Sequence, residues 1–296
     1  MKNKKTPLVS IGFPVHNGNS IKKNKFCINI SESLKSILNQ SYSNIEIIIS
    51  DNASTDGTSE IIKNLCKNDS RVKYFKQPKI LPSVENFNFV FNKSSGEYFK
   101  WSCHDDCISE NFIEENLQFL ENNSEFSFSS SPCFFDYNFT NKKNKLKFNF
   151  DLSTFERIKN FHKISSFCHS LFYGLIRKKN LDKTTDFSKN YWAMDWIIVL
   201  ELLLEGKFKT IDNGHIIIGS GGASSNVMYT SSVAYNNKKI YYFIPFYELN
   251  LIIIGKIFKS KTIRYLEKFL LSYLSIKLNA SYFRKKLKKT LEKYNS

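Results

Sequence analysis

The sequence lacks several features that mark whole classes of protein. No apolar run approaches the roughly 18 residues of a membrane-spanning helix, and no internal repeat is present. The basic N-terminus is followed by an apolar stretch that Pro14, His16 and Asn17 soon interrupt, so a signal peptide is not expected. We therefore expect a cytoplasmic protein, either free or held peripherally on the inner face of the cell membrane.

Cysteine pairs with metal-site spacing are also missing. The six cysteines form no C-x-x-C pair. Cys103 and Cys107 are four residues apart and flank acidic residues, but a structural zinc would need two more ligands at matching spacing. The pattern therefore indicates reduced thiols and neither a zinc site nor a disulfide framework.

The composition that is present indicates a folded enzyme-sized protein with an excess of positive charge. The 296 residues, 42% hydrophobic and 15% aromatic, suffice for one large α/β domain with an appendage or for two small domains. A net charge of +16 suits nucleic acid, an anionic membrane or a polyanionic substrate. A genome biased toward Lys, Asn and Ile gives the same charge, so charge alone does not decide between these partners.

Strand and helix patterns alternate along the first third of the chain. The expected strands are residues 8–13, 45–50, 72–75 and 98–101, and the helices between them are residues 29–39, 61–65 and 84–91. This alternation predicts a mostly parallel sheet flanked by helices, with ligands bound at the carboxyl ends of its strands. The loops at those ends are residues 14–19, 51–56, 77–86 and 102–107.

The remainder of the chain predicts more α/β structure and a helical extension. A helix at 111–120, a strand at 126–130, a Lys-rich surface loop at 138–149 and a helix at 192–205 are expected. From about residue 235 the pattern is helical, basic and amphipathic. This extension either packs on the main domain or lies on an anionic membrane. The expected domains are residues 1–230 and 231–296.

Acidic residues follow two of the expected strands. Asp105 and Asp106 come directly after the strand at 98–101, and a divalent cation would relieve their mutual repulsion. Mg²⁺ or Mn²⁺ held there would neutralise the charge of a leaving diphosphate. The alternative is a surface turn ahead of the next helix. Asp51 follows the second strand, where it could accept hydrogen bonds from a base or a ribose.

Three segments in this order resemble the family 2 nucleotide-diphospho-sugar glycosyltransferases, which have the Rossmann-like GT-A fold. They are Val9-Ser10-Ile11-Gly12-Phe13-Pro14-Val15-His16-Asn17, the run from Asp51 to Thr58, and Asp105-Asp106. The resemblance covers about residues 7–225. It implies a nucleotide-sugar pocket made by Pro14, His16, Asn17, Asp51 and Asp105, with Asp106 as the direct metal ligand. His16 stands where the family usually has Tyr.

The resemblance implies roles for three further residues. Asn86 aligns with a stretch that makes nucleotide contacts, Asp195 with the acidic catalytic base, and His215 with a ligand of the metal or the diphosphate. Each has a structural alternative: a helix-surface position for Asn86, a helix cap for Asp195, and an ordinary structural role for His215. The glycines at 219–222 fit a loop that closes over the donor.

The resulting hypothesis is an inverting glycosyltransferase that uses a nucleotide-diphospho-sugar, a UDP-sugar in the first place, with Mg²⁺ or Mn²⁺. Its acceptor would be a hydroxyl of a surface glycan or of a lipid-linked saccharide. A nucleotidyltransferase would show a Gly-rich, basic loop after its first strand, which residues 14–17 lack. A nucleic-acid-binding protein would gather its basic residues in one stripe, whereas here they are spread along the chain, so no nucleic-acid partner is expected.

Overall fold

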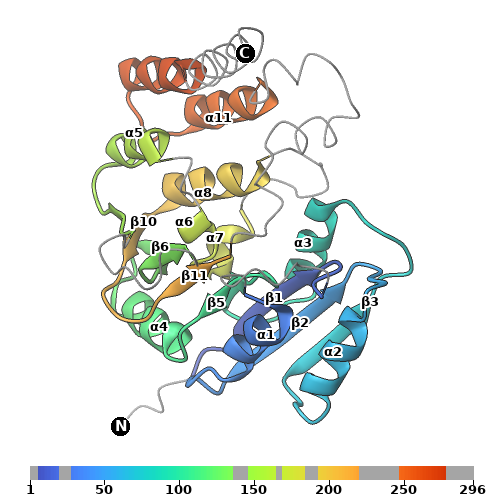
Figure 1. Ribbon diagram of the computed structural model, residues 1–296. Coiled ribbons are helices and arrows are strands. Elements are labelled where there is room, and N and C mark those ends of the chain that lie inside the picture. Colours follow the sequence, from blue (N-terminus) through green and yellow to red (C-terminus); the bar gives the residue numbers. More distant parts are fainter. Residues whose placement is uncertain are drawn as a thin grey trace, which may run out of the picture.

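The computed structural model describes residues 6–19, 28–135, 146–164, 169–183, 193–219 and 247–277. The first half alternates strands and helices, as predicted (Figure 1). Its elements are β1 (Val9–Val15), α1 (Ile30–Leu38), β2 (Ile45–Asp51), α2 (Thr58–Cys66), β3 (Val72–Lys76), α3 (Ser83–Asn92), β4 (Tyr98–Trp101), β5 (Cys107–Ile108), α4 (Phe112–Asn122), β6 (Phe126–Ser130) and β7 (Cys133–Phe135).

The second half contains shorter strands and the most buried helix. Its elements are β8 (Asn149–Phe150), α5 (Thr154–Ile164), α6 (His169–Phe172), β9 (Leu175–Arg177), α7 (Lys178–Leu181), α8 (Met194–Glu205), β10 (Lys207–Thr210), β11 (Ile216–Ile218) and α11 (Tyr247–Lys259). Residues 265–277 form a further helix. None of the described helices is long and apolar enough to cross a membrane.

The main sheet has eight strands in the order β3-β2-β1-β4-β9-β6-β10-β8. Strands β1 to β4 are mutually parallel, and β10 is parallel to β6. Strand β9 lies antiparallel between β4 and β6, and β8 is antiparallel to β10. The sheet is therefore mostly parallel with helices against it, which confirms the predicted fold class.

Local sequence explains the best-predicted elements. Every residue of β1 and β2 is buried, and both are nearly continuous apolar runs, as expected of parallel strands covered on both faces. Helix α1 begins with a capping box: the Asn29 side chain accepts from the Glu32 backbone N–H, and the Glu32 side chain accepts from that of Asn29. The positions of β1, β2 and α1 in the sequence are thus determined by local sequence patterns.

A small second sheet brings a distant segment to the loop after β4. Strand β11 pairs antiparallel with β5 and parallel with β7. Its last residue, Ile218, is followed by Gly219, whose backbone N–H donates to Asp106 Oδ1 at 3.0 Å. Residues more than 100 positions apart in the sequence therefore meet at one point, which is where the candidate site lies.

The C-terminal helices share the core of the main domain. Ile253 and Ile257 of α11 belong to the same buried cluster as the apolar residues of α8, and Lys256 forms an ion pair with Glu201 of α8. Figure 1 shows α11 stacked beyond α8, on the side away from the sheet. One face of the extension is therefore packed on the domain. The expected boundary at residue 230 lies outside the described residues.

Candidate functional site

The loop after β1 is held against the loop after β2. His16 Nδ1 lies 2.7 Å from the carbonyl oxygen of Asn52, and the Asn17 backbone N–H donates to Ser54 Oγ at 2.9 Å. The Thr55 backbone N–H donates to Asn17 Oδ1 at 2.9 Å. Asn17 has φ of 49°, in the left-handed region that Asn tolerates better than most residues. His16 and Asn17 are thus half-buried side chains at one rigid loop junction.

Pro14 belongs to β1 and is buried there. It pairs in register with Ser50 of β2, but the pairing of β1 with β4 ends two residues earlier, at Gly12 and Trp101. Strand β1 therefore extends past Trp101, the last residue of β4, at the carboxyl edge of the sheet. Ligands approach the strands of a doubly wound fold at this edge.

Asp51 is fully buried at the end of β2. Its Oδ1 accepts from the Ser54 backbone N–H at 2.9 Å, and its Oδ2 accepts from the hydroxyls of Ser59 and Tyr74. Burial acts to raise the pKa of this carboxyl, but the hydrogen bonds outweigh it and lower the pKa. Asp51 shapes its loop as a carboxylate. A contact between Asp51 and a nucleotide base would require one of these partners to move.

Asn86 links α3 to β2 and is not the helix-surface residue that the sequence allowed. It is buried, its Oδ1 accepts from Ser50 Oγ at 2.6 Å, and its Nδ2 donates to the Ser50 carbonyl at 3.2 Å. Both the oxygen and the nitrogen of the Asn86 amide are hydrogen-bonded within the protein. A nucleotide contact by Asn86 would therefore break a hydrogen bond between α3 and the strand that it covers.

Asp105 and Asp106 form an acidic centre in the loop after β4. Their carboxylate oxygens and Cys103 Sγ lie within 4.8 Å of one another. Both aspartates are buried, which excludes the alternative of a surface turn. Burying two neighbouring carboxylates is costly unless positive charge or hydrogen-bond donors face them. The Gly219 backbone N–H supplies one such donor to Asp106.

The two carboxylates fit Mg²⁺ or Mn²⁺, whereas the thiol does not. Both ions prefer oxygen ligands, commonly one or two carboxylates with phosphate oxygens and water completing the set. Burial raises the pKa of Cys103 well above its ordinary value, and Asp106 and Asp105 raise it further. Cys103 Sγ also lies 2.9 Å from the Tyr173 hydroxyl. Cys103 thus stays a thiol that contacts Tyr173, and the aspartate pair is the part of this cluster that fits such a cation.

Lys100 is a residue of this region to which the sequence interpretation gave no role. It is fully buried in β4, and its Nζ donates to the carbonyls of Trp101 at 3.0 Å and Tyr173 at 2.6 Å. The amine also lies 4.8 Å from the centre of the Phe112 ring. Burial lowers the pKa of Lys100 to about 7, and the charge of Asp106 opposes that shift. The sequence signal that identifies Lys100 is a lysine within an otherwise apolar strand, Tyr98–Trp101.

His104 likewise joins the acidic loop to the loop after β1. Burial lowers its pKa, the charges of Asp105 and Asp56 oppose this, and the nearby His16 lowers it further. The His104 ring also packs so close to Gly18 that a β-carbon there would lie 3.1 Å from it. His104 therefore lies between the β1 loop, which includes His16, and the aspartate pair.

Asp195 lies in the first turn of α8 and is not its cap. The N-cap position is Ala193, which has φ of 60°, and no side chain caps the helix there. Asp195 is half-buried. An acid in the first turn interacts favourably with the positive end of the helix dipole, which is consistent with the position of Asp195 there.

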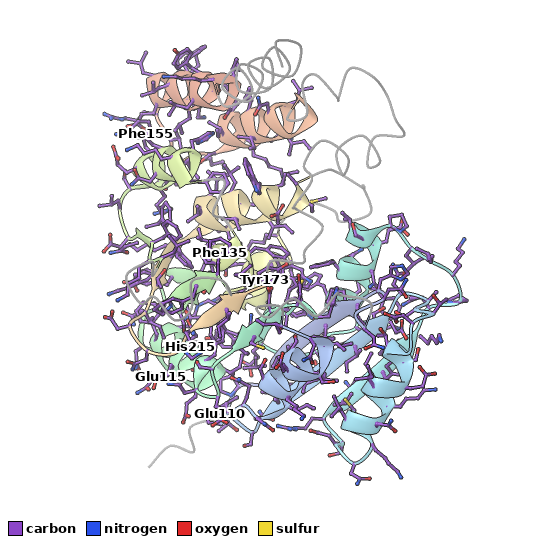
Figure 2. The ribbon with its side chains drawn as sticks, in the orientation of Figure 1. Glu110, Glu115, Phe135, Phe155, Tyr173 and His215 are labelled. Carbon is purple, nitrogen blue, oxygen red and sulfur yellow. The ribbon has the colours of Figure 1, made fainter. Side chains whose placement is uncertain are left out.

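His215 is not brought to the aspartate pair. It precedes β11, while Gly219, which reaches Asp106, follows the same strand. At about 3.3 Å per residue the two ends of this segment are roughly 13 Å apart. The His215 backbone exchanges hydrogen bonds with Ser109, and Figure 2 shows its side chain on the side of the molecule that carries Glu115, apart from Tyr173. Of the expected loop at 219–222, only Gly219 is described.

Comparison with known proteins decides the family. The family model for glycosyl transferase family 2 matches residues 12–183, more than half of the chain. The chain belongs to glycosyl transferase family 2. The matched residues include the β1 loop, Asp51 and the aspartate pair, which are the segments that carried the resemblance.

Curated relatives match over part of their length. An uncharacterized glycosyltransferase of Haemophilus influenzae is 36% identical over 117 residues, 40% of this chain and 44% of the relative. A GalNAc(5)-diNAcBac-PP-undecaprenol beta-1,3-glucosyltransferase of Campylobacter jejuni is 32% identical over 90 residues, 30% of this chain and 29% of the relative. The matches thus span less than half of the length of these relatives.

Solved structures extend the likeness in fold to nearly the whole chain. S. aureus TarS 1-349 in complex with UDP-GlcNAc aligns with 94% of this chain and 74% of TarS at a TM-score of 0.68 and 16% identity. A mannosyltransferase from Pyrobaculum calidifontis, in complex with GDP-Man and Mn²⁺, aligns with 94% of this chain and 74% of its own at a TM-score of 0.57 and 13% identity. This family 2 chain therefore has the GT-A fold.

Proposed function

We propose that the protein is an inverting glycosyltransferase that moves a sugar from a nucleotide-diphospho-sugar to an acceptor hydroxyl. The observation that carries this proposal is the buried pair Asp105 and Asp106 at the carboxyl end of β4, in a family 2 chain with a GT-A fold. Such a pair fits the cation that accompanies a diphosphate leaving group. Neither a nucleotidyltransferase nor a nucleic-acid-binding protein is favoured by any comparable feature.

The donor proposed in the first place is a UDP-sugar. Support comes from TarS, which was solved with UDP-GlcNAc. The mannosyltransferase, which was solved with GDP-Man and Mn²⁺, supports the divalent cation and not the choice of base. The rigid junction of the loops after β1 and β2 supplies the nucleotide pocket, with His16 and Asn17 at its mouth. Asp105 orients the sugar diphosphate, and Asp106 holds Mg²⁺ or Mn²⁺.

The proposed chemistry is a single displacement at the anomeric carbon. Asp195 removes the proton of the acceptor hydroxyl as that oxygen attacks from the face opposite the diphosphate. The bond from the anomeric carbon to the diphosphate oxygen breaks, through a transition state with oxocarbenium character, and the configuration inverts. When bound, the cation supplies positive charge to the departing diphosphate. The buried loop residues exclude water that would otherwise hydrolyse the donor.

The proposed acceptor is a saccharide, either of a surface glycan or carried on a lipid. The Campylobacter jejuni relative has a name that specifies an undecaprenol-linked saccharide, and this supports a lipid-linked acceptor here. Acceptor recognition is proposed to fall outside the loops described above, in residues 130–190.

The test compares Asp106→Asn and Asp195→Asn in a Mn²⁺-dependent transfer and UDP-binding assay. Asp106→Asn is expected to weaken Mn²⁺-dependent UDP binding by about 100-fold, because it removes a charged ligand. Asp195→Asn is expected to lower kcat by about 10²–10⁴ with UDP binding unchanged, because it removes only the base. Asp212→Asn, an exposed aspartate, is the control.

For each of the two variants, one outcome would contradict the role that we propose for the residue. If Asp106→Asn bound UDP with the full Mn²⁺ dependence of the wild type, with the fold intact by circular dichroism, Asp106 would not be a metal ligand. If kcat were unchanged in Asp195→Asn, Asp195 would not be the catalytic base. Absence of binding to any nucleotide diphosphate by the wild-type protein would overturn the proposed function itself.

A further inference from the structure

The helix at 265–277 carries apolar residues on two faces, and only one of them is packed. Leu271 and Ser275 are fully buried, and Ser275 Oγ lies 2.7 Å from His162 Nε2 of α5. Leu274 packs against the main core. The helix is therefore attached through this face, and its orientation on the domain is determined.

The opposite face is exposed and mostly apolar. Six large side chains on it are between 45% and 82% exposed. Their spacing of three and four residues places them along one stripe of the helix. Phe258 of α11, also exposed, lies with its ring 5.7 Å from that of Phe269 and extends the stripe to a second helix. This apolar patch consists of Phe258, Tyr265, Leu266, Phe269, Leu270, Tyr273 and Ile276.

Positive charge surrounds the apolar patch. Lys259, Lys261 and Lys277 are exposed, and Arg264 is exposed in an ion pair with Glu267. Residues 247–296 as a whole contain twelve of the 43 basic residues of the chain and only three of its 27 acidic residues. An extended apolar patch on a soluble domain marks an interaction surface, and its rim of charge specifies the partner.

We infer that the apolar patch docks the protein onto the surface of a membrane rich in anionic phospholipid. Apolar side chains would enter the boundary between headgroups and acyl chains, while the flanking lysines contact lipid phosphates. Two tyrosines in the patch suit this boundary, since each has an apolar ring and a polar tip. A second copy of the chain is disfavoured as the occupant, because it would bring an equally basic surface against this one.

The attachment of the helix determines how the molecule meets the bilayer. Because Leu271 and Ser275 are held on the domain, the helix lies in the plane of the membrane with its packed face toward the protein. Figure 1 shows the C-terminal helices at the end of the molecule remote from α1 and α2. The parallel half of the sheet is therefore directed away from the lipid. This inference does not depend on the proposed sugar transfer.

The experiment is co-sedimentation of the full chain with vesicles of phosphatidylcholine, with and without phosphatidylglycerol. Wild-type protein is expected to bind the anionic vesicles and to be released by salt. Replacing Leu266, Phe269 and Leu270 by Ser should lower the vesicle affinity by at least about tenfold, because each buried apolar side chain contributes substantially to partition. These positions are exposed, so the thermal unfolding curve should be unchanged.

Ile80→Ser is the matched control, and Lys261→Glu tests the charge. Ile80 is an equally exposed apolar residue in the loop before α3, and its replacement should leave vesicle binding unchanged. Lys261→Glu should weaken binding to anionic vesicles only. Equal binding by the triple Ser variant and the wild type would overturn the inference. So would a wild-type dimer that the triple variant abolishes without any effect on vesicle binding, since that result assigns the patch to a second copy.

Discussion

At the scale of single residues, Lys100 is the most unusual side chain near the site. A lysine buried in an apolar strand loses hydration, and its amine compensates by donating to the carbonyls of Trp101 and Tyr173. Tyr173 in turn contacts the Cys103 thiol beside the aspartate pair. Lys100 thus ties β4 to the segment before β9 and places a titratable amine close to the acidic centre.

Lys100 is expected to make stability depend on pH. Its folded-state pKa is about 7, below the ordinary 10.5, so between these values the unfolded chain binds more protons than the native one. The free energy of unfolding then rises with pH in this window, by up to about 1.4 kcal/mol per pH unit from this residue. Below about pH 7 both states are protonated and the contribution is flat.

The measurement is urea unfolding of the wild type and Lys100→Met from pH 6 to pH 10. The difference in unfolding free energy between the two proteins should be constant below pH 7. Above pH 7, the unfolding free energy of the wild type should rise relative to that of Lys100→Met. A difference that stays constant across the whole range would show that Lys100 keeps its ordinary pKa in the folded protein.

Sequence identified some residues of the candidate site and missed the contacts of others for a physical reason. Adjacent acids after an apolar strand are a local signal, so Asp105 and Asp106 could be identified directly. The burial of Asn86 depends on how α3 packs on β2, and the remoteness of His215 depends on the direction of β11. Both are properties of packing between segments far apart in the chain, which local patterns do not contain.

At the scale of elements, the end of β11 determines the shape of the acidic loop. A β-carbon on Gly219 would overlap the carbonyl oxygen of Asp105, so β11 comes this close only because residue 219 is a glycine. The same backbone donates to Asp106. Gly219→Ala is therefore expected to displace the Asp105 backbone and to weaken Mn²⁺-dependent UDP binding by about tenfold.

Gly255→Ala provides the matched control for Gly219→Ala. Gly255 lies in α11, and a β-carbon there meets nothing within 4 Å. This change should leave UDP binding unchanged and stabilise the helix by about 0.5–1 kcal/mol. Isothermal titration with UDP and Mn²⁺ measures both variants. If Gly219→Ala bound as tightly as the wild type, the contact between β11 and the aspartate loop would have no part in donor binding.

The elements that could be predicted are those with long periodic or apolar runs. Strands β1, β2, β3, β4 and β6 and helices α1 to α4 and α8 were placed from such runs. The small sheet of β5, β11 and β7 was not, because strands of two or three residues contain no period. Strand β9 and helix α5 fall in a stretch where no pattern was identified, so the link between the two halves of the sheet was missed.

At the scale of the whole molecule, nucleotide binding should appear as increased stability. A ligand that binds only the native state at a hundred times its Kd adds about 2.7 kcal/mol, which raises Tm by several degrees. We expect this rise with UDP and Mn²⁺, a smaller rise with GDP or CDP, and none when EDTA replaces the metal. A rise that is identical for all three nucleotides and insensitive to EDTA would contradict a specific, metal-dependent donor site.

Of the two alternatives for the C-terminal extension, packing on the main domain is observed for one face, and membrane contact by the other face stays a proposal. Sequence showed an amphipathic, basic pattern without showing which residues would find partners. The structure packs Ile253, Ile257 and Leu271 on the core and leaves Leu266 and Phe269 exposed. An amphipathic pattern predicts at most one buried face. Which of the two apolar faces of this helix is buried therefore depends on the three-dimensional arrangement, which the sequence pattern does not contain.

The placement of β9 has a consequence for how the chain is made. Strand β4 pairs with β1 on one edge and with β9 on the other, yet β9 is synthesised more than 70 residues after β4. At ribosomal rates of about 5–20 residues per second, that interval lasts roughly 4 to 15 s. Throughout it the apolar edge of β4 has no partner strand in its own chain. Between the translation of Trp101 and that of Leu175, the nascent polypeptide therefore exposes a strand edge at which it is prone to aggregate.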